Sequence, residues 1–138
     1  MLKGINWIGV LAAVVASQAI GFVWYGMVFS AQWMALTGIA VSESEGSSAM
    51  ALGAVQNLVI AIGLGWLIAR TGMAGWVGGA KAGLTACVFF GLATMSLRFI
   101  YGDDNTGLIP IDGGYMLIQY VVSGALIGGL KAGKKAEA

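Results

Sequence analysis

The chain has 138 residues, of which 59% are hydrophobic and 9% are charged, and its mean hydropathy is +0.88. Charged residues make up about 25% of an ordinary soluble domain, so the composition excludes that class. The net charge of +1 argues against nucleic-acid binding, and the absence of histidine removes the commonest metal ligand and general base. We therefore expect a single integral membrane domain over residues 1–138, with no metal, no cofactor and no nucleic-acid partner.

Apolar stretches long enough to cross a bilayer, which takes roughly 20 helical residues, occur four times in the chain. They cover residues 5–29, 50–69, 76–100 and 113–131. Short polar turns separate the second stretch from the third and the third from the fourth, so these neighbours are expected to run antiparallel. The sequence predicts an all-α membrane protein built as a four-transmembrane-helix bundle.

The segment between the first two predicted spans has a different pattern. Phe29, Trp33 and Leu36 recur at helical spacing among more polar residues, which is typical of a helix that lies in the membrane interface. Residues 42–48 are serine-rich and acidic and favour a linker outside the lipid. We expect a short interfacial helix between spans one and two.

Small residues recur at every fourth position in each predicted span, and we call these four sets the small-residue series. Such spacing lets helices approach at backbone distance, as is usual for helix association in lipid. We expect close packing, with at least one series left over for a homo-oligomer or a partner membrane protein. The glycines expected at helix contacts are Gly21, Gly79, Gly83, Gly91, Gly124 and Gly128. The series are Gly9, Ala13, Ser17 and Gly21; Gly53, Asn57, Ala61 and Gly65; Gly75, Gly79, Gly83, Cys87 and Gly91; and Tyr120, Gly124 and Gly128.

The charges are distributed unevenly between the two sides of a four-span chain. The basic residues of one side are Lys3, Arg70, Lys81, Lys131, Lys134 and Lys135. Arg98 falls near the other side, together with the acidic residues Glu43, Glu45, Asp103, Asp104 and Asp112. Because cytoplasmic loops carry the excess of lysine and arginine, both termini are expected in the cytoplasm.

Three stretches carry patterns more specific than the small-residue series. They are Asn6-Trp7 at the start of the first span; Gly21 to Tyr25, followed by Phe29 and Trp33-Met34; and Ile111 to Tyr115, leading to Gly124-Ala125. Over most of the chain these elements resemble the bacterial membrane family called domain of unknown function 1761. The resemblance implies a four-span, multi-pass protein of the bacterial inner (plasma) membrane, and it brings no activity with it.

Polar side chains gather in the half of the predicted bundle away from the cytoplasm. Helix positions seven apart nearly share a face, so Asp112, Tyr115 and Gln119 form one stripe on the fourth span. Charged side chains at membrane depth cost on the order of 2.5–3.5 kcal/mol at the bilayer centre and usually mark function or a pair. The candidate residues for a ligand-binding or structural polar cluster are Arg98, Asp112, Tyr115, Gln119, Gln18, Tyr25, Gln56 and Asn57.

Arg98 has two possible roles. Helical periodicity places it on the packing face with Cys87, Gly91 and Thr94, so it is expected to face the bundle interior. In one interpretation it is the anion-binding group of a polar pocket open to the periplasm. In the other it pairs with an aspartate, Asp112 or Asp103, and the nearby amides hold the helices together.

Three function classes fit the sequence. The first is an accessory, assembly or scaffold protein that packs through its glycine-rich helix faces. The second is a carrier that binds a small solute, an anion or a lipid at the Arg98 cluster. The third is an enzyme, for which only Asp112 with Tyr115 offers an acid–base pair at membrane depth. We rank them in that order and predict no catalytic residues.

Overall fold

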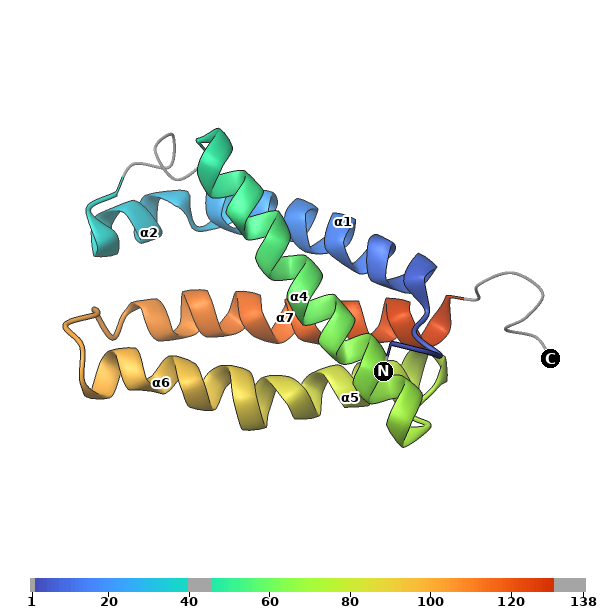
Figure 1. Cartoon of the computed structure of the whole chain (residues 1–138). Helices are drawn as coiled ribbons and strands as arrows, with labels where there is room; N and C mark the ends of the chain where they lie inside the picture. Colours follow the sequence, from blue (N-terminus) through green and yellow to red (C-terminus); the bar gives the residue numbers. More distant parts are fainter. Residues whose placement is uncertain (1, 40–45, 131–138) are drawn as a thin grey trace.

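The computed structural model describes residues 2–39 and 46–130, and within these two stretches all regular structure is helical. The helices form five continuous segments (Figure 1). They are α1 (Trp7–Val23), extended by the π-helical turn η1 (Trp24–Val28); α2 (Ser30–Thr37); α4 (Ser47–Thr71); α5 (Gly75–Ala86), joined through the π-helical turn η2 (Cys87–Leu92) to α6 (Ala93–Ile100); and α7 (Leu108–Gly129).

Local signals in the sequence set several helix ends. The Asn6 side chain caps α1 by accepting a hydrogen bond from the backbone N–H of Gly9 at 3.2 Å. Both α2 and α4 end at a glycine in the left-handed conformation, Gly38 with φ 73° and Gly72 with φ 69°. Gly75 has φ 82°, so the turn expected between spans two and three needs two glycines to reverse the chain.

Within the described part of the chain, three helical segments are long and apolar enough to cross a membrane: Trp7–Val28, Ser48–Thr71 and Gly75–Ile100, with 22, 24 and 26 residues. Only 22%, 28% and 22% of their most apolar windows are buried inside the chain, so most of these side chains face outward, where lipid can cover them. α7 has 22 residues but is not among the three. It carries Asp112 and Gln119 and is therefore less apolar.

α7 lies at the centre of the bundle. It runs beside α5 and α1, and α4 crosses it diagonally and also packs on α1 (Figure 1). Most of the surface of α7 is consequently buried or partly buried, with Ile109, Pro110, Leu117 and Ile118 as its exposed positions. The polar side chains of this helix thus point toward other helices.

Glycine is required where α5 and α7 meet. A Cβ atom at Gly79 would collide with the carbonyl oxygen of Gly124, and one at Gly83 would collide with that of Tyr120. Gly128 faces the backbone of α5 in the same way. The two helices therefore touch backbone to backbone, as small residues at four-residue spacing permit.

The other two glycines expected at helix contacts face side chains of α7. A Cβ at Gly21 would lie 3.2 Å from the hydroxyl of Tyr115, and one at Gly91 would lie 2.7 Å from the sulfur of Met116. Both neighbours are side chains rather than backbone, so these contacts are less rigid than those between α5 and α7.

The small-residue series are used inside the bundle. Every member is buried or partly buried except Gly75, which opens α5. The expectation that one series is left over for self-association or a partner is therefore wrong. The physical reason is the small size of the bundle: the small residues of α1 and α5 face α7, and those of α4 lie mainly against the N-terminal segment and α1.

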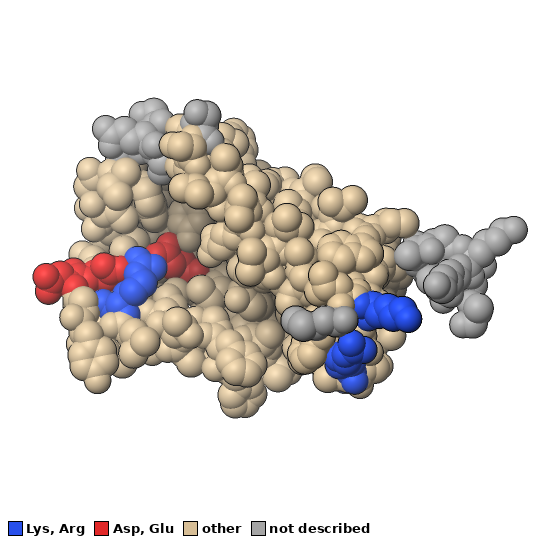
Figure 2. Space-filling view, viewed as in Figure 1, with Lys and Arg blue, Asp and Glu red and all other residues tan. Residues whose placement is uncertain are grey.

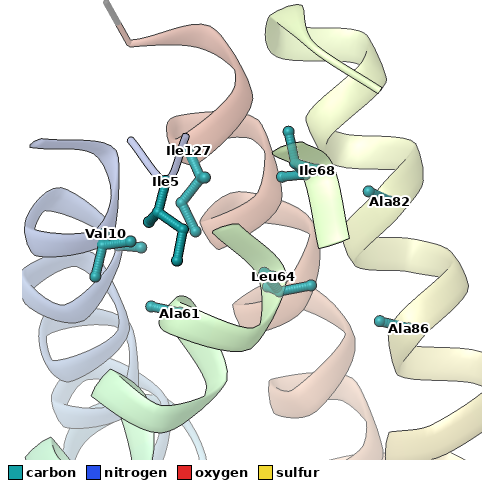
Figure 3. Close-up of a cluster of buried hydrophobic side chains, with 9 residues drawn as sticks. Ile5, Val10, Ala61, Leu64, Ile68, Ala82, Ala86 and Ile127 are labelled. Atoms are coloured by element: carbon teal, nitrogen blue, oxygen red, sulfur yellow. The ribbon is translucent and has the colours of Figure 1, made fainter. Parts of the chain in front are cut away.

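A dry apolar core fills one end of the bundle (Figure 3). It draws on the start of α1, the second half of α4, α5 and the end of α7. Its residues are Ile5, Val10, Ala13, Ala61, Leu64, Ile68, Ala82, Ala86 and Ile127. The helices are in close contact here, so this end of the bundle is closed.

The helix α7 corresponds to the fourth predicted span. It begins at Leu108, five residues before the predicted start at residue 113. Pro110 lies in its first turn, where a missing N–H breaks no helical hydrogen bond, so it starts the helix instead of closing the loop before it. The predicted end at residue 131 lies outside the described residues. So do Glu43, Glu45 and the three C-terminal lysines on which part of the predicted orientation rests.

Candidate binding cavity

A cavity of about 430 Å³ opens at the end of the bundle opposite the apolar core. It lies between α1 with η1, α2, the start of α4, α6 and the first half of α7. Figure 2 shows the surface hollowed beside the cluster of acidic side chains. Its volume falls in the range of roughly 300–1,000 Å³ typical of small-molecule sites. The wall is formed by Gln18, Gly21, Phe22, Tyr25, Trp33, Ala49, Met50, Gly53, Gln56, Met95, Arg98, Asp112, Tyr115, Met116 and Gln119.

A chain of three amides joins α1, α4 and α7 beneath the cavity. The Asn57 amide donates to Oε1 of Gln18 at 2.9 Å, and the Gln119 amide donates to Oδ1 of Asn57. Asn57 and Gln119 are each 4% exposed. Because both side chains are almost fully buried, each bond satisfies an amide that would be costly to leave unpaired.

Hydroxyl groups extend this polar layer between α1 and α7. The Oγ atoms of Ser17 and Ser123 lie 3.2 Å apart, and the Tyr115 hydroxyl donates to the carbonyl oxygen of Ser17 at 3.3 Å. Among the residues the structure describes, every buried side-chain nitrogen or oxygen has a hydrogen-bond partner. A satisfied polar layer thus separates the dry core from the cavity.

Two consecutive side chains of η1, the extension of α1, donate hydrogen bonds to the start of α7. The Tyr25 hydroxyl donates to Oδ1 of Asp112 at 2.7 Å, and the indole N–H of Trp24 donates to the carbonyl oxygen of Ile111 at 2.9 Å. The Tyr25 bond fixes the carboxylate of Asp112, whose side chain is 14% exposed, in the cavity wall.

Aromatic rings surround Tyr25 on two sides. Its ring centroid lies 5.2 Å from that of Tyr115 and 6.0 Å from that of Trp33, with the rings edge to face in both pairs. Trp33 belongs to α2, so this short helix supplies part of the cavity wall. Asp112 therefore shares its part of the wall with an aromatic cluster.

Arg98 does not face the bundle interior, and that expectation is wrong. Its side chain is 52% exposed. Its Nε donates to Oδ2 of Asp104 at 2.6 Å, a second guanidinium nitrogen pairs with the same oxygen, and the third lies 3.7 Å from Oδ2 of Asp112. The closer partner is therefore Asp104, from the loop before α7, and Asp112, one of the two aspartates expected from the sequence, forms a second and longer ion pair.

The π-helical turn η2 explains this error. A π-helical turn takes more residues than an α-helical turn, so it rotates everything beyond it relative to uninterrupted 3.6-residue periodicity. Met95 consequently takes the packing position and is 8% exposed, whereas Thr94 and Arg98 are exposed. The predicted alignment of Arg98 with Cys87 ends at this turn.

Most of the residues of the sequence-predicted cluster lie around this cavity. Seven of its eight members line the wall, and Asn57 lies behind it, bonded to Gln18 and Gln119. Sequence reasoning missed Asp104, and it missed the apolar wall residues Phe22, Trp33, Met50, Met95 and Met116. The helical spacing of Trp33 indicated an interfacial helix, but it did not indicate a place in the cavity wall. The methionines carried no sequence signal for the cavity, because apolar side chains are ordinary in a membrane helix.

Fold and site together define a helical membrane protein with a polar cavity at one end of its bundle. The chain belongs to the family described as Protein of unknown function (DUF1761), which matches residues 8–128. This match confirms the resemblance carried by the three specific stretches. No curated protein and no solved structure matches the chain.

Proposed function

We propose that the protein binds a small amphipathic molecule in this cavity, as a small-solute or lipid-binding protein or carrier of the bacterial inner membrane. The observation that supports this most directly is the composition of the wall. It places polar groups such as Asp112, Tyr115 and Gln119 opposite large apolar side chains such as Phe22 and Met50. A mostly apolar cavity with a few convergent polar groups is the usual form of a small-molecule site.

The scaffold function, which ranks first from the sequence, is no longer supported by the feature that suggested it. It depended on glycine faces available to a partner, and these faces pack against other helices of the same chain. A homo-oligomer or a partner membrane protein remains a prediction from the sequence. The cavity, in contrast, is a specific feature that a purely structural bundle does not need.

We also propose that α7 is a fourth span and that α2 lies in the membrane interface. The polar face of α7 is turned into the bundle, so its polar residues do not lie on the surface that it offers to lipid. Figure 2 supports an orientation with cytoplasmic termini: acidic side chains gather at one end beside one basic group, and the other visible basic side chains lie at the opposite end. The cavity would then open toward the periplasm.

Reporter fusions test this topology. A fusion after Ser48 is expected to report the periplasm and a fusion after Lys135 the cytoplasm, because one span precedes the first point and four precede the second. Paired reporters, one active only outside and one active only inside the membrane, measure both positions. The same compartment for both fusions contradicts the four-span proposal.

A cavity-filling substitution tests binding. Gly53 lines the cavity and a Cβ there meets only Oε1 of Gln18, at 3.8 Å, so Gly53→Leu is expected to fill the space without a backbone collision. The protein purified from native membranes in mild detergent should carry a small-molecule adduct in intact-mass measurements, and Gly53→Leu should lose it.

The matched control is Gly63→Leu on the same helix. Gly63 is exposed and has no neighbour within 4 Å of an added Cβ, so this variant should keep the adduct. Absence of any adduct from the wild-type protein, or its survival in Gly53→Leu, contradicts binding in the cavity.

A further inference from the structure

Among the described residues, three charged side chains lie at the polar end of the cavity, and their formal charges sum to −1. They are Arg98, Asp104 and Asp112. Arg98 uses two of its nitrogens on Asp104, so most of its charge is compensated at the rim. An anion entering the cavity would meet a guanidinium already paired with a carboxylate, together with a second carboxylate in the wall.

Asp112 is the less completely paired of the two carboxylates. Its contact with Arg98, at 3.7 Å, is longer than a hydrogen bond of roughly 2.7–3.2 Å, and its one hydrogen bond from a described side chain comes from the neutral hydroxyl of Tyr25. The carboxylate lies in the wall and is only 14% exposed. A largely desolvated negative charge in this position is strongly stabilised by a cation.

The rings beside Asp112 add a second preference for positive charge. Tyr25, Tyr115 and Trp33 all line the cavity, and Tyr25 lies within 6.0 Å of both other rings. Aromatic faces attract ammonium groups within about 6 Å, most strongly where water is excluded, and they favour alkylated amines. A carboxylate beside several rings is therefore suited to an organic cation more than to a strongly hydrated metal ion.

The rest of the wall is suited to hydrocarbon. Phe22 and Met50 lie on the α1 and α4 sides, and Met95 and Met116 lie on the α6 and α7 sides. Methionine side chains adapt to ligands of different shape.

From this arrangement we infer that the ligand is a hydrophobic organic cation, an amine or quaternary ammonium with an apolar substituent, whose charge lies against Asp112. The inference rests on the proposed function and names the ligand class of that same cavity. It replaces the anion considered from the sequence, because the main partner of Arg98 is Asp104.

Three probes of nearly equal shape test the charge preference on the full-length protein in a neutral detergent. They are benzyltrimethylammonium, its uncharged carbon isostere neopentylbenzene, and the anion phenylmethanesulfonate. Titration calorimetry against detergent blanks should give the tightest binding for the ammonium. Asp112→Asn should weaken ammonium binding by about tenfold or more while leaving neopentylbenzene unchanged, because only the charged probe gains from the carboxylate.

Two further variants keep the test independent of folding effects at Asp112. Trp33→Leu removes a ring without touching the Tyr25–Asp112 hydrogen bond and should weaken the ammonium several-fold relative to the neutral isostere. Asp103→Asn removes an exposed carboxylate from the same end of the molecule, outside the cavity wall, and should bind all three probes like the wild type.

Equal binding of the three probes, tighter binding of the sulfonate, or an ammonium affinity indifferent to Asp112→Asn would overturn the inference. The proposed function survives these results if the binding that is seen disappears in Gly53→Leu. Failure of every probe to bind contradicts the inference, and the adduct experiment then decides the proposed function separately.

Discussion

Gly83→Leu is expected to destabilise the protein strongly. A Cβ at this position would collide with the backbone carbonyl of Tyr120, and backbone in the middle of α7 cannot move aside as a side chain can. Overpacking costs about 1–3 kcal/mol, whereas replacing glycine in a helix gains only about 1 kcal/mol in helix propensity. The cost of the collision therefore outweighs the gain in propensity. Thermal unfolding followed by circular dichroism in mild detergent should show a clear fall in Tm.

Gly63→Leu is the control for the same chemical change. Gly63 lies in the interior of α4, is exposed, and has open space around an added Cβ. This variant should match or exceed the wild-type Tm, because leucine is the better helix former. If both variants unfold at the wild-type temperature, the backbone contact between α5 and α7 is not a source of stability.

Asn57→Leu is expected to have the second large effect. It removes the donor to Gln18 and the acceptor for Gln119, and so leaves the buried amide of Gln119 and the partly buried amide of Gln18 without this partner. Each such loss costs on the order of 1–3 kcal/mol. The free energy of unfolding, measured by denaturant titration in detergent, should fall accordingly.

The adjacent Gln56 supplies the control, since it carries the same amide on the same helix but is exposed at the cavity wall. Gln56→Leu should change stability much less than Asn57→Leu. Adding Gln119→Leu to Asn57→Leu should recover part of the loss, because a hydrogen-bonded pair replaced on both sides leaves fewer unpaired groups. Equal losses for the Gln56 and Asn57 variants would show that the amide chain is not structural.

The helices could be predicted from the sequence because their causes are local. Apolar length, turn residues such as Gly72 and Gly75, and small residues at four-residue spacing each act over a few positions. The predicted start of α7 is too late, because a proline such as Pro110 is common both at the end of a loop and in the first turn of a helix. Which helix becomes central is a property of the assembled bundle and has no local signal.

The same distinction holds at the cavity. Gln18 and Gln119 lie on α-helical stretches, and Tyr25 lies only one residue after the start of η1, so helical periodicity is enough to bring the three to one place. Arg98 lies beyond η2, and nothing in the residues of that turn distinguishes a π-helical from an α-helical path. Its partner Asp104 comes from a loop, whose path the sequence does not specify. That the assembled residues bind a ligand stays a prediction.

The dry core has an electrical consequence in the proposed four-span arrangement. A membrane voltage falls mainly across low-dielectric material, and one elementary charge crossing the whole of a 100 mV drop changes energy by about 2.3 kcal/mol. The layer that contains Val10, Leu64 and Ile127 is such material, whereas the polar cavity beside it opens to one side only. A cation that reaches Asp112 from that side crosses little of the field, so its occupancy should be nearly independent of voltage.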